Sequence, residues 1–330
     1  MEPPLPAGRA HSPVVSAVVP SFNGERYLRK CLQSIQRQTL EDLEIVVVDD
    51  GSTDSSRSVV LEEAAGDARI RLIEHERNRG IAAARNTGIL ESRGRYVGFL
   101  DQDDVWLPSK LDVQVSTLER SGEGVEAVFS DVLMIDEEGG TLGRCHHEYI
   151  PQSVNLMSRE ERLRACFLHN FIPLIGLLVR RSSFERIGLF DETVRGGMDD
   201  FELCLRLVGN ADVRYIDRPL AAHRVHGGNY SQRTDRLLSD LPDLIERAVE
   251  EFPGLDALAA RKRALLHFRL ARYHRDAGRF HEAREELREA MRADPSWSTP
   301  RLMMPLFALG RTGLAVLAVR RAIRRFLARS

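Results

Sequence analysis

Apolar and polar positions alternate in blocks along the first hundred residues. β-branched apolar runs at 14–19 and 43–48 each give way to polar turn residues and then to helical spacing, as in "RYLRKCLQSIQRQ". The strand pattern "RIRLIEHE" precedes the helix-favouring "NRGIAAARNTGILESRG", and residues 96–100 form a further strand. This alternation predicts a doubly wound α/β sheet, whose ligands gather beyond the carboxyl ends of the strands.

Polar side chains follow three of the predicted strands, so we expect them to share one crevice. They are Ser21 and Asn23 after the first strand, Asp49 and Asp50 after the second, and Asp101 and Asp103 in "DQDD" after the run at 96–100. Acids after a strand are often helix caps, and that alternative stays open for Asp49 and Asp54. The "DQDD" set is less easily explained in this way, because like charges at one strand end repel each other unless a cation is present.

Composition narrows the classes of ligand. The formal net charge is -2 and charged residues make up 29% of the chain, which argues against a nucleic-acid binder that relies on a basic field. Neither the redox dinucleotide pattern G-x-G-x-x-G nor a Walker phosphate loop follows the first strand. Carboxylates suit Mg²⁺ or Mn²⁺, which can bridge to a diphosphate, so the crevice indicates transfer of a nucleotide-activated sugar.

Other features bear on cellular location. The four cysteines have no paired spacing, which favours reduced thiols over a zinc site or a disulfide framework. Residues 1–13 are proline-rich and have no apolar core, so we expect a disordered lead rather than a signal peptide. No apolar run approaches the roughly 18 residues of a spanning helix. We therefore expect a cytoplasmic protein, with peripheral contact to the inner face of the membrane as an open possibility.

Five motifs in order carry a resemblance to a known family. "VSAVVPSFNGERYLRKCLQSIQRQTLEDLEIVVVDDGSTDSS", "NRGIAAARNTG", "GRYVGFLDQDD", "GGMDDFELCLRL" and "HRVHGGNYS" resemble the successive motifs of the family 2 glycosyltransferases over about residues 14–231. The resemblance implies a GT-A fold, a Rossmann-like mixed sheet flanked by helices. It also implies an inverting, metal-dependent enzyme of the hexosyltransferase type. Such an enzyme moves a sugar from a nucleotide-sugar donor, commonly UDP-linked, to a glycan or lipid-linked hydroxyl acceptor in bacterial surface polysaccharide synthesis.

The resemblance assigns nucleotide-binding roles to five residues. Asp50 matches the carboxylate that accepts a hydrogen bond from the base, and Pro20 and Phe22 would line the base pocket. Arg85 matches a basic nucleotide-binding position from which a guanidinium reaches phosphate or a base edge, with an exposed helix arginine as the alternative. Asp101 aligns with the acid that faces the ribose.

Two further residues match metal-binding positions. Asp103 aligns with the direct ligand of the Mn²⁺ or Mg²⁺ ion, and His226 matches the histidine of the pattern R-x-H-x-x-N-x-S. A neutral imidazole can complete a shell of carboxylates, although a lone histidine is often structural. No role is assigned to Asp104 or His223.

An acidic pair supplies the candidate base. Inversion by direct displacement needs a base on the face opposite the leaving group, and the resemblance places it in the pair Asp199 and Asp200. The second acid is the base in most members, so we expect Asp200, with Asp199 as the substitute. The departure from the common Glu-Asp pair is the aspartate at 199. The alternative is that both acids merely cap a helix.

The remaining chain has a different composition. We expect the glycosyltransferase domain to span 14–234 and an all-α extension to span 235–330, with a hairpin at about 258–295 that resembles one tetratricopeptide repeat. A basic amphipathic segment at about 313–330 could lie on an anionic membrane or dock on the hairpin.

Two other functions stay open at this point. A nucleotidyltransferase also uses acids at strand ends and a metal, but it gives no reason for the later base motif. A catalytically silent sugar-nucleotide-binding scaffold gives no physical reason to keep clustered, repelling acids at 101, 103 and 200.

Overall fold

The computed structural model describes residues 12–122, 124–145, 150–194, 197–227, 240–300 and 303–304. The chain divides into two compact units. One is formed by Met1–Arg195 and Asp199–Gly228, and the other by Gly196–Met198 and Asn229–Ser330.

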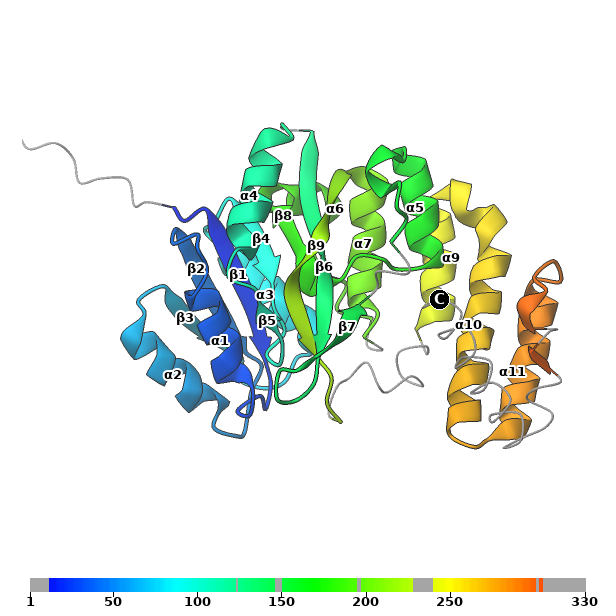
Figure 1. The fold of residues 1–330 in the computed structure, drawn as a ribbon, viewed down its shortest axis with the longest axis horizontal. Helices are drawn as coiled ribbons and strands as arrows, with labels where there is room; N and C mark the ends of the chain where they lie inside the picture. Colours follow the sequence, from blue (N-terminus) through cyan, green and yellow to red (C-terminus); the bar gives the residue numbers. More distant parts are fainter. Residues whose placement is uncertain are drawn as a thin grey trace, which may run out of the picture. The chain divides into compact units, whose positions relative to one another are not determined.

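One mixed sheet is the centre of the first unit (Figure 1). Its strands are β1 (Val15–Ser21), β2 (Leu43–Asp49), β3 (Ile70–Glu74), β4 (Tyr96–Phe99), β5 (Val105–Trp106), β6 (Val125–Ile135), β7 (Thr141–Cys145), β8 (Leu177–Arg180) and β9 (Asp212–Arg224). They lie in the order β3-β2-β1-β4-β8-β6-β9-β5, with β7 paired to β6. The first four are parallel, whereas β8 is antiparallel to both of its neighbours.

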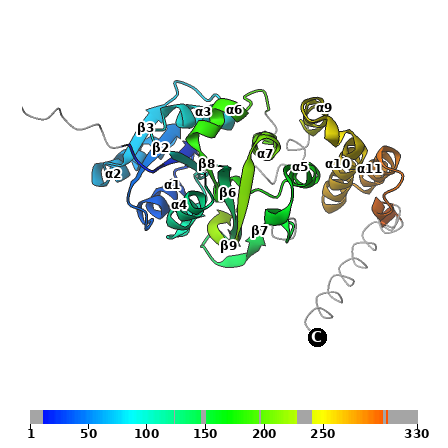
Figure 2. The ribbon, with the colours of Figure 1, turned by 90° about the horizontal axis from the view of Figure 1, so that it is seen from above.

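Helices cover both faces of this sheet (Figure 2). They are α1 (Leu28–Gln36), α2 (Ser56–Gly66), α3 (Ile81–Glu91), α4 (Lys110–Arg120), α5 (Arg159–Leu168), α6 (Phe184–Ile187) and α7 (Asp199–Asn210), with single 3-10 turns at Val154–Leu156, Leu174–Gly176 and Arg181–Ser183. The expected mixed sheet flanked by helices is confirmed. The second half departs from a purely parallel doubly wound sheet, because β8 enters between β4 and β6 in the opposite direction.

Strands β1, β2 and β4 are buried along their whole length, and so on both faces, which explains why their sequences are largely apolar. On one face, Val15, Ala17 and Val19 pack in the main core with α1. On the other, Val46 and Val48 pack with α3. Side chains of successive strand residues point to opposite faces, so both faces of a central strand must be apolar when both are covered.

Register brings the functional strand ends to one edge. β1 pairs in parallel with β2, with Ser21 opposite Asp49, and with β4, with Val18 opposite Phe99. The chain therefore leaves β1, β2 and β4 at the same edge of the sheet, as the pattern of polar residues predicted.

The second unit is helical in its described part. It contains α9 (Leu241–Glu251), a 3-10 turn at Pro253–Leu255, α10 (Asp256–Asp276) and α11 (Phe280–Ala293). Buried Ala271, Ala283 and Leu287 form a cluster of their own between α10 and α11, and Gly278 adopts a φ of 75° where the chain reverses. The kinship of this hairpin with tetratricopeptide repeats stays a prediction. The predicted basic segment at 313–330 lies outside the described residues.

Two expectations concern smaller features. Cys31, Cys166 and Cys204 are buried free thiols, while the side chain of Cys145 lies outside the described part. Among the described helices, none has the length and apolar character needed to cross a membrane.

Candidate functional site

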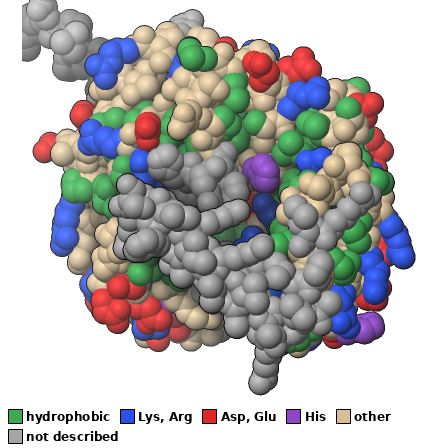
Figure 3. All heavy atoms as spheres, turned by 45° about the vertical axis from the view of Figure 1, so that its right-hand side comes forward, with side chains coloured by type: hydrophobic (Ala, Val, Ile, Leu, Met, Phe, Trp, Pro, Cys, Tyr) green, Lys and Arg blue, Asp and Glu red, His purple; other side chains and the backbone are tan. Residues whose placement is uncertain are grey.

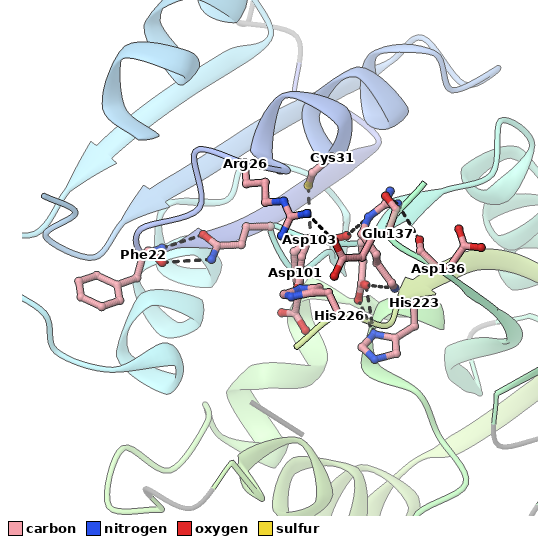
Figure 4. A network of polar contacts seen from close by, with 12 residues as sticks. Phe22, Arg26, Cys31, Asp101, Asp103, Asp136, Glu137, His223 and His226 are labelled. Carbon is pink, nitrogen blue, oxygen red and sulfur yellow. Dashed lines mark hydrogen bonds and ion pairs between the residues drawn. The ribbon is translucent and has the colours of Figure 1, made fainter. Parts of the chain in front are cut away.

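The acids of "DQDD" lie beyond β4 and have different partners. Asp101 and Asp103 are partly exposed, whereas Asp104 is 1% exposed. Figure 4 shows Asp101 and Asp103 close to His226 and His223. In the space-filling view a hollow opens in the surface, with a histidine at its edge and basic side chains within it (Figure 3).

Asp103 and His226 are brought together as the sequence predicted for a metal pair. His226 Nε2 lies 2.8 Å from Asp103 Oδ2, and the imidazole packs against the ring of Tyr27 with 4.9 Å between centroids. The contact joins the loop after β4 to the segment that follows β9. A carboxylate oxygen and an imidazole nitrogen form a donor set that suits Mn²⁺.

These residues fit a metal that is shared with a phosphate ligand. Within the described ranges, no cluster of three or more His, Cys, Asp or Glu side chains is suited to a metal ion. Two protein ligands are sufficient where phosphate oxygens and water complete the shell, which is how Mg²⁺ is usually held in phosphate-binding enzymes.

Asp104, to which the sequence assigned no role, attaches the acidic loop to β9. Its Oδ1 accepts the backbone N–H of Arg224 at 2.8 Å, and both carboxylate oxygens lie 3.1 Å from His223 Nδ1. Burial raises the pKa of Asp104 to about 6, although His223 opposes the shift. Burial would lower the pKa of His223, but the bond to Asp104 and its charge raise that pKa to about 9. Between these values both groups are ionised and attract each other.

Arg224 is a functional residue that the sequence reasoning missed. Its buried guanidinium donates from Nε to the backbone carbonyl of Asp103 at 3.0 Å and lies over the ring of Tyr27. It also donates from Nη1 to the backbone carbonyls of Asp136 and Glu137, at 3.1 and 2.9 Å. The sequence did contain a hint of this role, because Arg224 is the arginine of the R-x-H pattern, two residues before His226.

Arg85 lies between the two acidic motifs. Its Nη2 donates to Asp101 Oδ1 at 2.7 Å and its Nη1 donates to Asp199 Oδ2 at 2.6 Å. Burial would lower the pKa of Arg85, but the charges of Asp101 and Asp199 outweigh it and raise the pKa. The alternative of an exposed helix arginine is wrong, since Arg85 is 4% exposed. Its contact with phosphate or a base edge stays a prediction.

The two acids of the pair, Asp199 and Asp200, differ in their hydrogen-bond partners. Asp199 is 2% exposed and binds Arg85, whereas Asp200 Oδ1 accepts only the neighbouring N–H of Phe201, at 2.6 Å, among its contacts with described residues. Both stand in the first turn of α7. Burial and then the charge of Asp199 raise the pKa of Asp200 to about 7, against the opposing charge of Arg85. A carboxylate in this state accepts a proton readily near neutral pH.

The predicted base-binding residues lie at the ends of β1 and β2. Pro20 is buried within β1, and the ring of Phe22 just beyond it is 42% exposed. Asp50 is 3% exposed; its Oδ1 accepts the N–H of Arg79 at 2.9 Å, and its Oδ2 accepts the N–H of Gly80 at 2.8 Å.

His75 is a further residue that the sequence reasoning missed. Its Nδ1 lies 2.6 Å from Asp50 Oδ1, and its Nε2 lies 2.9 Å from the Thr87 hydroxyl. Asp50 therefore organises the loop before α3 in addition to any contact with a ligand. No short pattern announced this histidine, because its partner is brought close only by the pairing of β2 with β3.

A mixed sheet with polar residues at the carboxyl end of β1, acids at the carboxyl ends of β2 and β4, and an acidic pair on α7 is the architecture of GT-A glycosyltransferases. Comparison with known proteins leads to the same class of enzyme. The model of the family "Glycosyl transferase family 2" matches residues 16–188, and the chain belongs to that family.

Relatives of this chain are named as glycosyltransferases. It is 31% identical to a putative glycosyltransferase, EpsH, of Bacillus subtilis over 69% of this chain and 65% of that one. It is 30% identical to an uncharacterised glycosyltransferase of Rickettsia felis over 68% of this chain, and 28% identical to the chondroitin synthase of Escherichia coli over 66%. The matches span only 36% and 30% of those two longer relatives.

Solved structures share the fold at low identity. The S. aureus protein TarS, in complex with UDP-GlcNAc, has 17% identity and a TM-score of 0.60, over 91% of this chain and 87% of that one. The mannosyltransferase PcManGT of Pyrobaculum calidifontis, in complex with GDP-Man and Mn²⁺, has 21% identity and a TM-score of 0.60, over 95% and 81%.

Proposed function

We propose that this glycosyltransferase moves a sugar from a nucleotide-sugar donor to a hydroxyl acceptor with inversion at the anomeric carbon, and that Asp200 is the base. The main support for this proposal is that Asp199 and Asp200 differ in their bonding partners and that the pKa of Asp200 is raised. Asp199 is bound to Arg85, whereas Asp200 has no side-chain partner among the described residues and a pKa of about 7. A base must be able to take up a proton at the operating pH, and a pKa of about 7 gives Asp200 this property.

In the proposed step, Asp200 accepts the proton of the acceptor hydroxyl while the oxygen of that hydroxyl attacks the anomeric carbon of the donor sugar. The bond from that carbon to the diphosphate oxygen breaks, and the nucleoside diphosphate leaves from the opposite face with the electron pair. Asp199 and Arg85 take no proton in this step. Their ion pair holds the start of α7, and so the carboxylate of Asp200, in a fixed position.

The donor is proposed to be UDP-linked, with its base near Pro20, Phe22 and Asp50 and its ribose near Asp101. These residues lie at or just beyond the ends of β1, β2 and β4, which meet at one edge of the sheet, and this supports a single elongated site. The fold neighbours carry UDP-GlcNAc in one case and GDP-Man in the other, so the fold admits both kinds of nucleotide. Arg85 is proposed to support the phosphate end of this site through Asp101.

Asp103 and His226 are proposed to hold Mn²⁺ or Mg²⁺ together with the donor's phosphates. When bound, the ion would offset the charge that develops on the departing diphosphate. Asp104 and Arg224 keep the two ligands in place through the bonds described above.

The acceptor is proposed to be a growing glycan or a lipid-linked sugar. The names of the relatives, which include a chondroitin synthase, support an acceptor of this kind. Peripheral contact with an anionic membrane is proposed for residues 313–330. Removal of that segment would then reduce co-sedimentation with vesicles of anionic lipid, and equal sedimentation with and without it would remove this part of the proposal.

The central proposal is tested by Asp200→Asn. We expect the variant to bind UDP as tightly as the wild type and to lose transfer by about 10²-fold or more. In the wild type, NMR of the product should show the anomeric configuration opposite to that of the donor. Retained transfer by the variant would overturn Asp200 as the base, and a product of unchanged configuration would overturn the inverting mechanism.

A further inference from the structure

Phe22 is exposed at the end of β1, whereas apolar residues at the ends of β2 and β4, Val48 and Leu100, are buried. Phe22 is 42% exposed at the end of β1, directly after the buried Ser21. The next residue, Asn23, has a positive φ of 49°, so the chain turns sharply beyond the ring. Packing in the core does not account for the position of this side chain.

One side chain binds both backbone polar groups of Phe22. The Gln102 carbonyl oxygen Oε1 accepts the N–H of Phe22 at 2.9 Å, and the Gln102 amide nitrogen Nε2 donates to the carbonyl of Phe22 at 3.1 Å. Oε1 also accepts the hydroxyl of Ser21 at 3.1 Å. The amide of Gln102 thus pairs with the backbone N–H and carbonyl of Phe22 as a neighbouring strand would.

A glycine provides the space for this pairing. A Cβ at Gly24 would lie 2.1 Å from Gln102 Oε1, far inside contact distance. The φ of Gly24 is not in the left-handed region, so the requirement for glycine here is room for the amide rather than backbone freedom. Residues 22, 24 and 102 therefore form one packed unit, which we call the amide clamp.

Gln102 also lies between the two acids of the proposed donor site. Asp101 precedes it and Asp103 follows it, so a single loop carries the clamp on Phe22 and the contacts to Arg85 and His226. The separation between the exposed ring and Asp103 is fixed by this loop rather than by two independent segments.

We propose that Gln102 is a positioning residue for the nucleobase: it fixes the peptide of Phe22 so that the exposed ring forms one wall of the base pocket of a nucleoside diphosphate. The inference rests on the proposed function and deepens it, because it names the residue that couples the base end of the donor to its diphosphate end. An ordered ring binds a planar base without first losing conformational entropy, so the clamp acts on affinity for the nucleotide rather than on the chemical step.

The test uses the full chain and two independent ways to open the clamp. Gln102→Met keeps the length of the side chain and removes its hydrogen bonds, whereas Gly24→Ala leaves the amide intact and displaces it. Gly66→Ala, at a glycine whose Cβ would meet nothing within 4 Å, is the matched control. The probe is UDP with Mn²⁺, measured by calorimetry, and thermal unfolding is recorded for every variant.

We expect Gln102→Met and Gly24→Ala each to weaken UDP binding by about tenfold, as the loss of one or two hydrogen bonds implies. The change should appear in KM for the donor more than in kcat. In the background of Phe22→Ala, Gln102→Met should add nothing, because it acts through the ring. Gly66→Ala should bind as the wild type does.

Two failures are distinguishable. A wild-type chain that binds neither UDP nor GDP would overturn the proposed function and this inference together. Wild-type binding that both clamp variants leave unchanged, or an equal additional loss in the Phe22→Ala background, would overturn the inference alone. A clamp variant that unfolds at lower temperature but binds UDP normally would show that Gln102 serves only the stability of the fold, which also overturns the inference.

Discussion

Arg85 and Asp199 form a buried ion pair, with 2.6 Å between Nη1 and Oδ2, and the same guanidinium binds Asp101 through its other terminal nitrogen. One arginine on α3 thereby joins the acidic motif after β4 to the acidic motif on α7. Asp199 is held in this ion pair, whereas burial and the charge of Asp199 raise the pKa of the neighbouring Asp200 to about 7.

Transfer should follow the ionisation of Asp200. The charged groups that act on it are Asp199, Arg85 and Asp101, and the pKa is raised to about 7. A base works only when deprotonated, so kcat should increase about tenfold per pH unit below this value and level off above it. A pH profile of kcat at saturating donor and acceptor checks the prediction. A profile flat from pH 5 to 8 would contradict it.

Asp199→Asn should shift that profile to lower pH. The substitution removes the negative charge that raises the pKa of Asp200, while Arg85, which lowers it, remains. We expect the acidic limb to move down by about one pH unit. UDP affinity, measured in parallel, is the control for general damage to the site. Movement of the limb to higher pH would show that the charge of Asp199 is not the cause.

Asp103→Asn and His226→Ala should each remove the dependence of UDP binding on Mn²⁺. In the wild type, chelation of the metal should weaken binding, because the bridge between protein and phosphate is lost. In the variants, affinity should be low with or without Mn²⁺. Glu138→Gln, which removes an exposed acid on the nearby β6–β7 turn, is the matched control and should behave as the wild type. Equal Mn²⁺ dependence in all the proteins would exclude Asp103 and His226 as ligands.

Asp104→Asn should affect stability. Asp104 is 1% exposed and lies 3.1 Å from His223, whose side chain is 29% exposed, so the substitution removes the counter-charge of a partly buried imidazolium. We expect a loss of about 2–4 kcal/mol in the free energy of unfolding near pH 7.5. Above the His223 pKa of about 9 the imidazole is neutral, and the loss should be smaller. Urea unfolding at pH 7.5 and 9.5 compares the two conditions; an equal loss at both would point to the bond with the Arg224 N–H instead.

Gly88→Ala should destabilise the first unit. Gly88 lies where α3 approaches β1, and a Cβ there would be 2.3 Å from Cγ1 of Val18. Overpacking of this kind costs about 1–3 kcal/mol. Gly66→Ala is again the control, since its Cβ would meet nothing within 4 Å. A thermal unfolding midpoint for Gly88→Ala equal to that of the control would show that α3 can move away at little cost.

Sequence patterns predicted the first half of the sheet well because β1, β2 and β4 are largely apolar, are buried along their whole length and alternate with helices. The antiparallel entry of β8 between β4 and β6 was not predictable, since a four-residue apolar strand has no direction in its sequence. The motifs also placed Asp103 beside His226, because each motif follows a strand end.

Hydrogen-bond partners that tertiary packing brings together could not be predicted from the sequence in the same way. The sequence predicted a ligand contact for Arg85 but not its bonds to two carboxylates, and no sequence pattern indicated the bond between His75 and Asp50. The spacing of residues in a sequence shows which side chains lie on the same face of a helix or strand. It does not show which side chain from a distant element forms a hydrogen bond with them.

The bond from the Arg224 N–H to Asp104 has a consequence for biosynthesis. β9 and the contacts of Asp104 come from residues after 211, so Asp104 has no bond to β9 while the nascent chain ends before them, although Gln102 and Asp101 of the same loop can already bind Phe22 and Arg85. The parallel half of the sheet precedes β9 along the chain, and the two proposed metal ligands, Asp103 and His226, can meet only when the chain has emerged past His226. A truncated product that ends before this point is therefore expected to have no transfer activity.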